Sequence, residues 1–159
     1  MGFALSDMQL TSTAFEQGGA IPKQHTGEGV DTSPALSWSD APEGTKAFAV
    51  ICHDPDAPLV SPAGTYGYVH WVLYNIPANV TSLEEGSTGF TNGKTDFGTE
   101  VYGGPMPPNG HGKHQYYYWV LALNEQVELE PGLTMWQLLE RVEPNLIGMN
   151  RLVGTYQRF

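Results

Sequence analysis

The segment that most constrains the fold is Ala47-Phe48-Ala49-Val50-Ile51-Cys52, a run that is apolar at odd and even positions alike. Side chains alternate between the two faces of a strand, so this run predicts a strand that is covered on both faces. Residues 68–76 and 115–123 have the same character. Three doubly buried strands in so small a chain indicate a sheet that lies under a second layer.

The composition fits one globular domain. The chain has 159 residues, of which 40% are hydrophobic, so a core of ordinary size can form. Its 19 glycines and 12 prolines are spread along the length, which favours many turns and short strands over a helical bundle. No repeat or low-complexity segment interrupts the chain. We therefore expect a single domain over residues 1–159.

The charge balance limits the class of partner. The net charge is −10 and only seven residues are Lys or Arg, which argues against nucleic acid, because phosphate backbones are bound by clustered basic side chains. No apolar run approaches the roughly 20 residues of a membrane span, so insertion into a membrane is not expected. The single cysteine, Cys52, cannot form an internal disulfide, and the first residues do not resemble a secretory signal. These features predict a cytoplasmic protein.

Weaker patterns predict the remaining elements. Residues 4–15, 34–38 and 152–159 are expected to form short strands. Thr134-Met135-Trp136-Gln137 has the form of a capping box and predicts one helix near the C-terminus, which Pro144 ends or follows with a short turn.

One long segment, residues 86–112, contains many glycines and shows little periodicity. A loop of this length inside a compact domain is usually functional, unless the segment contains elements that its pattern does not show. Its expected apolar anchors are Phe90, Phe97 and Val101.

Polar side chains gather at the ends of the three predicted buried strands. Asp54 and Asp56 follow the first strand, and His70 lies near the start of the second. His114 begins the third strand, on the same face as Tyr116. We expect these carboxylates and imidazoles to converge on one small pocket. An imidazole can donate to a ligand oxygen when a carboxylate or carbonyl holds its other nitrogen, and the two aspartates are candidates for that role.

The segment before His114 is expected to form a wall of this pocket. Pro107, Pro108 and Gly110 allow a rigid backbone to approach closely, with free N–H groups that form a nest for anions. His111 lies in the same segment, and its residue type fits either the pocket or a structural position.

These residues also have simpler interpretations. Strict alternation places His70 on the face of Val72 and Tyr74, and a histidine in an apolar strand is more often a satisfied core residue than a ligand. Asp56 is equally consistent with a turn in which its side chain only caps a backbone N–H. Tyr116 fits the core or the rim of a pocket.

Three motifs follow one another in this chain: Asp54-Pro55-Asp56-Ala57-Pro58, then His70-Trp71-Val72-Leu73-Tyr74-Asn75-Ile76-Pro77, then Gly104-Pro105 through His114-Gln115-Tyr116. In this order and spacing they resemble the phosphatidylethanolamine-binding protein family, and most closely its bacterial branch, often described as Raf-kinase-inhibitor-like. Residues 21–22, 33–38 and 152–156 also resemble that branch. The resemblance therefore covers essentially the whole chain.

The resemblance implies a mainly β fold of two antiparallel sheets with a few short peripheral helices. It also implies a small anion pocket at one end, lined by Asp54, His70, His114 and Tyr116, with Pro107 and Pro108 in its wall. Phosphate-type ligands would lie between the two histidines. Bacterial members that resemble this chain tend to be homodimers, so a homodimer is expected. Gln115 stands where members often carry Arg, which leaves one fewer cation near the ligand.

These observations favour a binding protein for a small phosphate- or carboxylate-bearing ligand, such as a phospholipid head group, without a cofactor or metal. A hydrolase is the alternative, because aspartate and histidine also transfer protons or hold metals. Against it, no serine or cysteine is evidently placed as a nucleophile, and the spacings match no zinc signature. A third hypothesis, a module that inhibits a kinase or protease, depends on the family resemblance alone.

Overall fold

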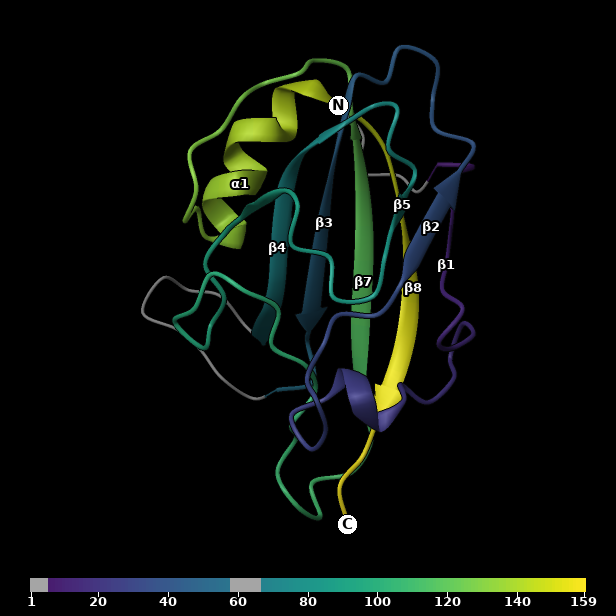
Figure 1. Cartoon of the computed structure of the whole chain (residues 1–159), viewed down its shortest axis with the longest axis vertical. Helices are drawn as coiled ribbons and strands as arrows, with labels where there is room; N and C mark the ends of the chain where they lie inside the picture. The colour runs from purple at the N-terminus through teal and green to yellow at the C-terminus, as the bar shows by residue number, and fades with distance from the viewer. Residues whose placement is uncertain (1–5, 58–66) are drawn as a thin grey trace.

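The computed structural model describes residues 6–57 and 67–159, which form two antiparallel sheets and one α-helix (Figure 1). The strands are β1 (Gln9–Thr11), β2 (Leu36–Ser39), β3 (Ala47–Asp54), β4 (Tyr68–Pro77), β5 (Ser82–Leu83), β6 (Thr91–Asn92), β7 (His114–Leu123) and β8 (Leu146–Tyr156). The helix is α1 (Met135–Val142), and short 3-10 turns occur at η1 (Lys23–His25) and η2 (Glu143–Asn145). The larger sheet has the order β6-β4-β3-β7-β8, and the smaller one has the order β1-β2-β5. The prediction of a mainly β fold with two antiparallel sheets is confirmed.

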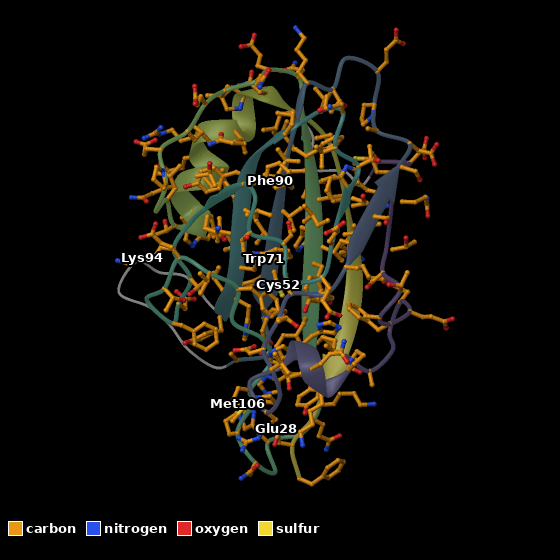
Figure 2. The ribbon with its side chains drawn as sticks, viewed as in Figure 1. Glu28, Cys52, Trp71, Phe90, Lys94 and Met106 are labelled. Carbon is orange, nitrogen blue, oxygen red and sulfur yellow. The ribbon has the colours of Figure 1, made fainter. Side chains whose placement is uncertain are left out.

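The three strands predicted from their apolar runs form the centre of the larger sheet. β3 pairs with β4 on one side and with β7 on the other. Alternate residues of β3, such as Val50 and Cys52, pack between the two sheets beside Trp71, whereas Ala49 and Ile51 belong to the cluster under α1. Figure 2 shows Cys52 and Trp71 in the middle of the molecule. Each of these strands is apolar at both parities because both of its faces are buried.

His70 breaks the regular alternation of β4. Cys52 pairs with Trp71 and His53 pairs with Val69, so His70 is one extra residue on its strand, which is a β-bulge. Its side chain lies against Tyr116, in the region between the sheets, and not beside Val72 on the α1 side. The prediction that His70 shares a face with Val72 and Tyr74 is therefore wrong, because it assumed an unbroken pleat.

The capping box before α1 is present. Thr134 accepts a hydrogen bond from the Gln137 N–H at 3.2 Å, and the Gln137 side chain accepts one from the Thr134 N–H at 3.0 Å. After the η2 turn, which contains Pro144, β8 begins at once and pairs with the whole of β7. The last strand thus begins at Leu146, earlier than its apolar pattern predicts, because pairing with a long neighbour extends it through polar residues.

The other elements differ from prediction mainly at their ends. β1 is shorter than the predicted strand at residues 4–15, of which residues 4 and 5 lie outside the described part of the chain. Residues 86–112 contain only the two-residue β6, as expected of a long loop. Within that loop Phe90 packs against the core, but Val101 is 59% exposed and is not an anchor. Among the described residues, no helix is long and apolar enough to cross a membrane.

Candidate functional site

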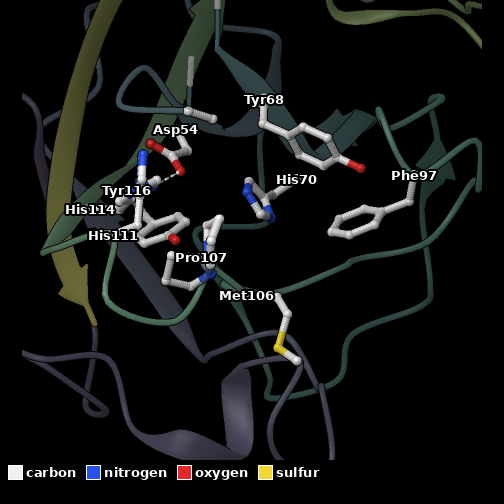
Figure 3. Close-up of a pocket in the computed structure, with 11 residues that line it drawn as sticks. Asp54, Tyr68, His70, Phe97, Met106, Pro107, His111, His114 and Tyr116 are labelled. Carbon is white, nitrogen blue, oxygen red and sulfur yellow. Dashed lines mark hydrogen bonds and ion pairs between the residues drawn. The ribbon is translucent and has the colours of Figure 1, made fainter. Parts of the chain in front are cut away.

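A cavity of about 380 Å³ opens at one end of the larger sheet (Figure 3). Both neighbours of β3 run antiparallel to it, so its C-terminal end lies beside the N-terminal ends of β4 and β7. The predicted polar residues are found at these three strand ends. The cavity is lined by Asp54, Ala57, Tyr68, His70, Phe97, Met106, Pro107, Pro108, His111, His114 and Tyr116.

Asp54 and His114 form a buried ion-pair contact. The Asp54 Oδ2 lies 2.7 Å from the His114 Nδ1, and the two side chains are 3% and 4% exposed. The other carboxylate oxygen accepts the Asp56 N–H at 2.8 Å. A buried carboxylate is costly unless its oxygens are paired in this way. The Nδ1 proton of His114 points towards Asp54 in this contact. The Nε2 of His114 is therefore the ring nitrogen that can bind other partners.

That second nitrogen is bonded to His111. The His111 Nδ1 lies 2.7 Å from the His114 Nε2, so one proton lies between the two rings. Asp54, His114 and His111 therefore form one hydrogen-bonded chain from the buried end of β3 to an exposed loop. The sequence left the role of His111 open, and the structure places it in the cavity wall.

His70 is held by a different partner. Its Nδ1 lies 2.7 Å from the Gly103 carbonyl oxygen, which can only accept, so Nδ1 carries the proton. Burial lowers the pKa of His70, although the Gly103 carbonyl and the Asp54 charge oppose this shift. A neutral His70 with a proton on Nδ1 has a lone pair on Nε2. This nitrogen can accept a hydrogen bond, whereas the sequence pattern predicted a donor.

Tyr116 completes the floor of the cavity. It is 1% exposed, and its ring packs edge-on against His70 at 5.2 Å between centroids. Burial raises the pKa of Tyr116, and the charge of Asp54 raises it further, so the phenol keeps its proton.

The remaining predicted residues lie in different places. Pro107 and Pro108 line the cavity, and the Pro107 carbonyl accepts from Arg158 at 3.1 Å. Gly110 is not among the lining residues, and its N–H donates to the Arg158 carbonyl at 3.0 Å. The expectation that this N–H is free for an anion is therefore wrong, because the C-terminal segment already uses it.

Asp56 does not orient an imidazole. Its carboxylate accepts the backbone N–H of Gln115 at 2.7 Å, which ties the end of β3 to the start of β7. It is exposed and is not among the residues that line the cavity. Its role is the simpler one that the sequence allowed, the capping of a backbone N–H.

The polar motifs of the sequence do not predict the apolar part of the cavity. Phe97 and Met106 line it and are 43% and 44% exposed. The Phe97 ring packs against Tyr68 and His70, and it lies so close to Gly103 that a Cβ there would collide with it. In Figure 3, Asp54, His114 and Tyr116 lie on one side of His70 and Phe97 lies on the other. The position of Phe97 in a long loop was the only indication in the sequence.

Comparison with known proteins identifies the family. The model of the family described as phosphatidylethanolamine-binding protein matches residues 11–157. The chain belongs to the phosphatidylethanolamine-binding protein family. The resemblance inferred from the three motifs is thus confirmed. Among the relatives of the chain, the UPF0098 protein of Aquifex aeolicus is 39% identical over 158 residues, which cover 95% of this chain and 89% of that protein.

Two solved structures have the same fold. The phosphatidylethanolamine-binding protein homologue CT736 of Chlamydia trachomatis is 39% identical, with a TM-score of 0.86 over 96% of this chain and 98% of that one. YbcL of Escherichia coli, described as a new member of the mammalian phosphatidylethanolamine-binding protein family, is 33% identical. Its TM-score is 0.87 over 97% of this chain and 100% of that one.

Proposed function

We propose that this member of the phosphatidylethanolamine-binding protein family binds a small ligand in which a phosphate or carboxylate group adjoins an apolar group. The observation that carries the proposal is the convergence of Asp54, His114, His111 and His70 on one cavity with an apolar side. A binding pocket of this kind is mostly apolar, with a few polar groups that fix the orientation of the ligand.

The polar side of the cavity suits an oxyanion. His114 and His111 form one side of the cavity, and the Asp54 carboxylate would balance a positive charge on their rings. An imidazolium there can donate an N–H to the ligand. The Tyr116 hydroxyl keeps its proton, so the cavity lining also contains an O–H hydrogen-bond donor. Each hydrogen bond to a charged group contributes about 1.5–3 kcal/mol net. Two or three such bonds, less the cost of immobilisation, correspond to a Kd on the order of micromolar to millimolar for a bare anion.

The size of the cavity calls for more than a bare anion. A water molecule takes up about 30 Å³ in the liquid, so a cavity of about 380 Å³ has room for several groups of that size. Phe97 and Met106 offer half-exposed apolar surface beside the polar end. An aromatic or alkyl substituent on the ligand would cover this surface and gain about 25 cal/mol for each Å² removed from water.

Titration with phenyl phosphate, followed by the NMR signals of the histidine rings, tests the proposal. We expect the His70 and His114 signals to move at millimolar ligand or below, and His114→Ala to weaken binding at least tenfold. Val101→Ala is the control, because Val101 is exposed and is not among the lining residues. The proposal fails if the two ring signals stay unmoved at millimolar ligand in the wild-type protein.

One observation favours hydrolysis as a second candidate. A hydrogen-bonded Asp54–His114–His111 chain can transfer protons as well as orient a donor. Among the described residues, the cavity lining includes no Ser, Thr or Cys that could act as a nucleophile. The described residues also include no group of three or more side chains that could hold a metal ion. Turnover of 4-nitrophenyl phosphate by the wild type, lost in His114→Ala, would favour hydrolysis over binding.

Three expectations from the sequence and its family resemblance stay predictions. A homodimer predicts about twice the chain mass in sedimentation equilibrium. A cytoplasmic protein is expected in the cytosolic fraction after cell fractionation. A regulatory module predicts capture of one kinase or protease by the wild type and its loss with Asp54→Ala.

A further inference from the structure

We propose that Asn109 is a modification site, at which the side-chain amide is lost through a cyclic imide at a rate that Arg158 controls. In this reaction the backbone nitrogen of Gly110 attacks the side-chain carbonyl carbon of Asn109 and loses its proton, and ammonia leaves. Water then opens the imide at either of its two carbonyls, which leaves aspartate or isoaspartate at position 109. Water is the only co-reactant, and the site is independent of the ligand proposed above.

Two asparagines in the sequence are followed by glycine, in the pairs Asn92-Gly93 and Asn109-Gly110. Glycine favours closure of the imide ring because it has no Cβ to hinder the approach of its nitrogen, and because its backbone rotates freely. The sequence alone does not distinguish the two pairs. Their surroundings in the structure do.

The Asn92-Gly93 pair is held by backbone hydrogen bonds. Asn92 pairs with Leu73 between β6 and β4, and its carbonyl accepts the Gly132 N–H at 3.0 Å. The N–H of Gly93, a buried residue, donates to the Val72 carbonyl at 2.8 Å. Ring closure at Asn92 would have to open the edge of the larger sheet.

The Asn109-Gly110 pair lies in an exposed turn. The His111 N–H donates to the Pro108 carbonyl at 3.1 Å, which closes the turn around the pair, and Gly110 has a φ of +72°. Both residues of the pair are exposed, and within residues 6–57 and 67–159 the Asn109 side chain has no hydrogen-bond partner. The amide is therefore open to water and free to turn towards the backbone.

A single backbone hydrogen bond restrains the nucleophile. The Gly110 N–H donates to the Arg158 carbonyl at 3.0 Å, and Figure 1 shows the last residues of the chain beside the loop that precedes β7. The imide nitrogen carries no hydrogen. This bond and the imide therefore exclude each other, and Asn109 can react only while Gly110 is released from Arg158.

The Arg158 side chain sets how often that release occurs. Its guanidinium donates to the Pro107 carbonyl at 3.1 Å, and its Nε lies 3.2 Å from the Glu28 carboxylate in an ion-pair contact. The Tyr156 hydroxyl of β8 donates to the other Glu28 oxygen at 2.6 Å. The next residue, Phe159, is 96% exposed and adds no packing. A segment held by so few contacts opens locally at a low free-energy cost.

The modification changes the loop in two ways. Either product adds a carboxylate at position 109, and isoaspartate also adds one carbon to the backbone between Pro108 and His111. Both of these neighbours line the cavity. Conversion of Asn109 therefore alters the charge and the length of a segment that forms the cavity wall.

Incubation of the whole chain at pH 8, followed by digestion and mass spectrometry, tests the site. The replacement of –NH2 by –OH is measured at positions 92 and 109, and chromatography separates the isoaspartate peptides. In the folded protein we expect Asn109 to convert about tenfold or more faster than Asn92, because the sheet must open at Asn92. In urea, where neither pair is held, the two rates should agree within about threefold.

Arg158→Ala tests the control of the rate. The variant removes both side-chain contacts of Arg158, and we expect Asn109 to convert about fivefold faster, with an equal rise in hydrogen exchange of the Gly110 N–H. Arg141→Ala is the matched control, because it removes an exposed ion pair with Glu130 and should leave the rate at Asn109 unchanged. Glu28→Gln should give a smaller rise than Arg158→Ala, because the bond from Arg158 to Pro107 stays.

Asn92 serves as an internal reference for the fold. A variant that loosens the whole protein accelerates both sites, whereas release of the Arg158 segment accelerates Asn109 alone. Equal rates at the two sites in the folded wild type would overturn the assignment of Asn109 as the modification site. A wild-type rate at Asn109 in Arg158→Ala, or a rise at both sites together, would overturn the control by Arg158.

Discussion

The Nδ1 of His114 lies 2.7 Å from the carboxylate of Asp54, sixty positions away in the chain, and both side chains are almost fully buried. This contact joins the end of β3 to the start of β7 in the lining of the cavity. It also sets the donor side of the cavity, because it fixes which nitrogen of His114 faces His111. The same hydrogen bond thus ties two strands together and orients an imidazole that we propose takes part in ligand binding.

Removing the Asp54 charge should cost stability as well as binding. In Asp54→Asn, the His114 Nδ1–H loses its carboxylate acceptor, and a hydrogen bond to a charged group contributes about 1.5–3 kcal/mol net. Asp56→Asn is the matched control, since the Asp56 carboxylate is exposed and, among the described residues, accepts one backbone N–H. In urea unfolding, the loss of unfolding free energy should therefore be at least twofold larger for Asp54→Asn than for Asp56→Asn. Equal losses in the two variants would contradict this account of the pair.

The lowered pKa of His70 predicts how stability varies with pH. The folded state disfavours the charged ring, so protons bind the unfolded chain first as the pH falls below about 6.5. The contribution of neutral His70 to the unfolding free energy is fully present above that pH. It is lost as the pH falls through the lower pKa that His70 has in the folded state. Unfolding free energies measured by urea between pH 8 and pH 5 should fall less steeply in His70→Gln than in the wild type. Parallel curves would show that His70 does not titrate differently in the two states.

Phe97 should affect only ligands that carry an apolar group. Phe97→Ala removes half-exposed aromatic surface from the cavity, and we expect about a tenfold loss of affinity for phenyl phosphate. Affinity for inorganic phosphate should stay within about twofold, because the polar side is unchanged. Val101→Ala is the control, as Val101 is an exposed residue of the same loop outside the cavity lining. Equal effects of Phe97→Ala on both ligands would assign Phe97 a structural role alone.

Gly103 should tolerate no side chain. A Cβ there would collide with the Phe97 ring, so Gly103→Ala must displace that ring or the backbone that holds His70. Overpacking of this kind costs about 1–3 kcal/mol, and phenyl phosphate binding should weaken with it. Gly89→Ala is the control, because nothing lies within 4 Å of its Cβ position. Thermal unfolding and calorimetry of the two variants would refute the prediction if Gly103→Ala behaved like Gly89→Ala.

The sequence predicted the centre of the fold because burial leaves a direct pattern. The run that became β3 is apolar at both parities since the second sheet covers one face and α1 covers the other. The ends of short elements were less predictable. β8 extends back to Leu146 through polar residues because β7 offers backbone partners along its whole length, and pairing of this kind leaves no trace in the composition of one strand.

The candidate site was predicted in part for similar reasons. Asp54 and His114 could be predicted because one follows an apolar run and the other begins one, so the runs also locate these two polar side chains. The bulge at His70 could not be predicted, since one extra residue on β4 changes the direction of the side chain without changing its type. The hydrogen bond from the Gly110 N–H to the Arg158 carbonyl could not be predicted either. It is a tertiary contact between distant residues and depends on where the C-terminal segment lies.

A crystal structure of the protein with phenyl phosphate at pH 5.5 tests the central claim most directly. The account predicts the phosphorus between His70 and the His111–His114 pair, one phosphate oxygen within hydrogen-bond distance of His70 Nε2, and the phenyl ring against Phe97. A phosphate group bound elsewhere, or an empty cavity at saturating ligand, would contradict it.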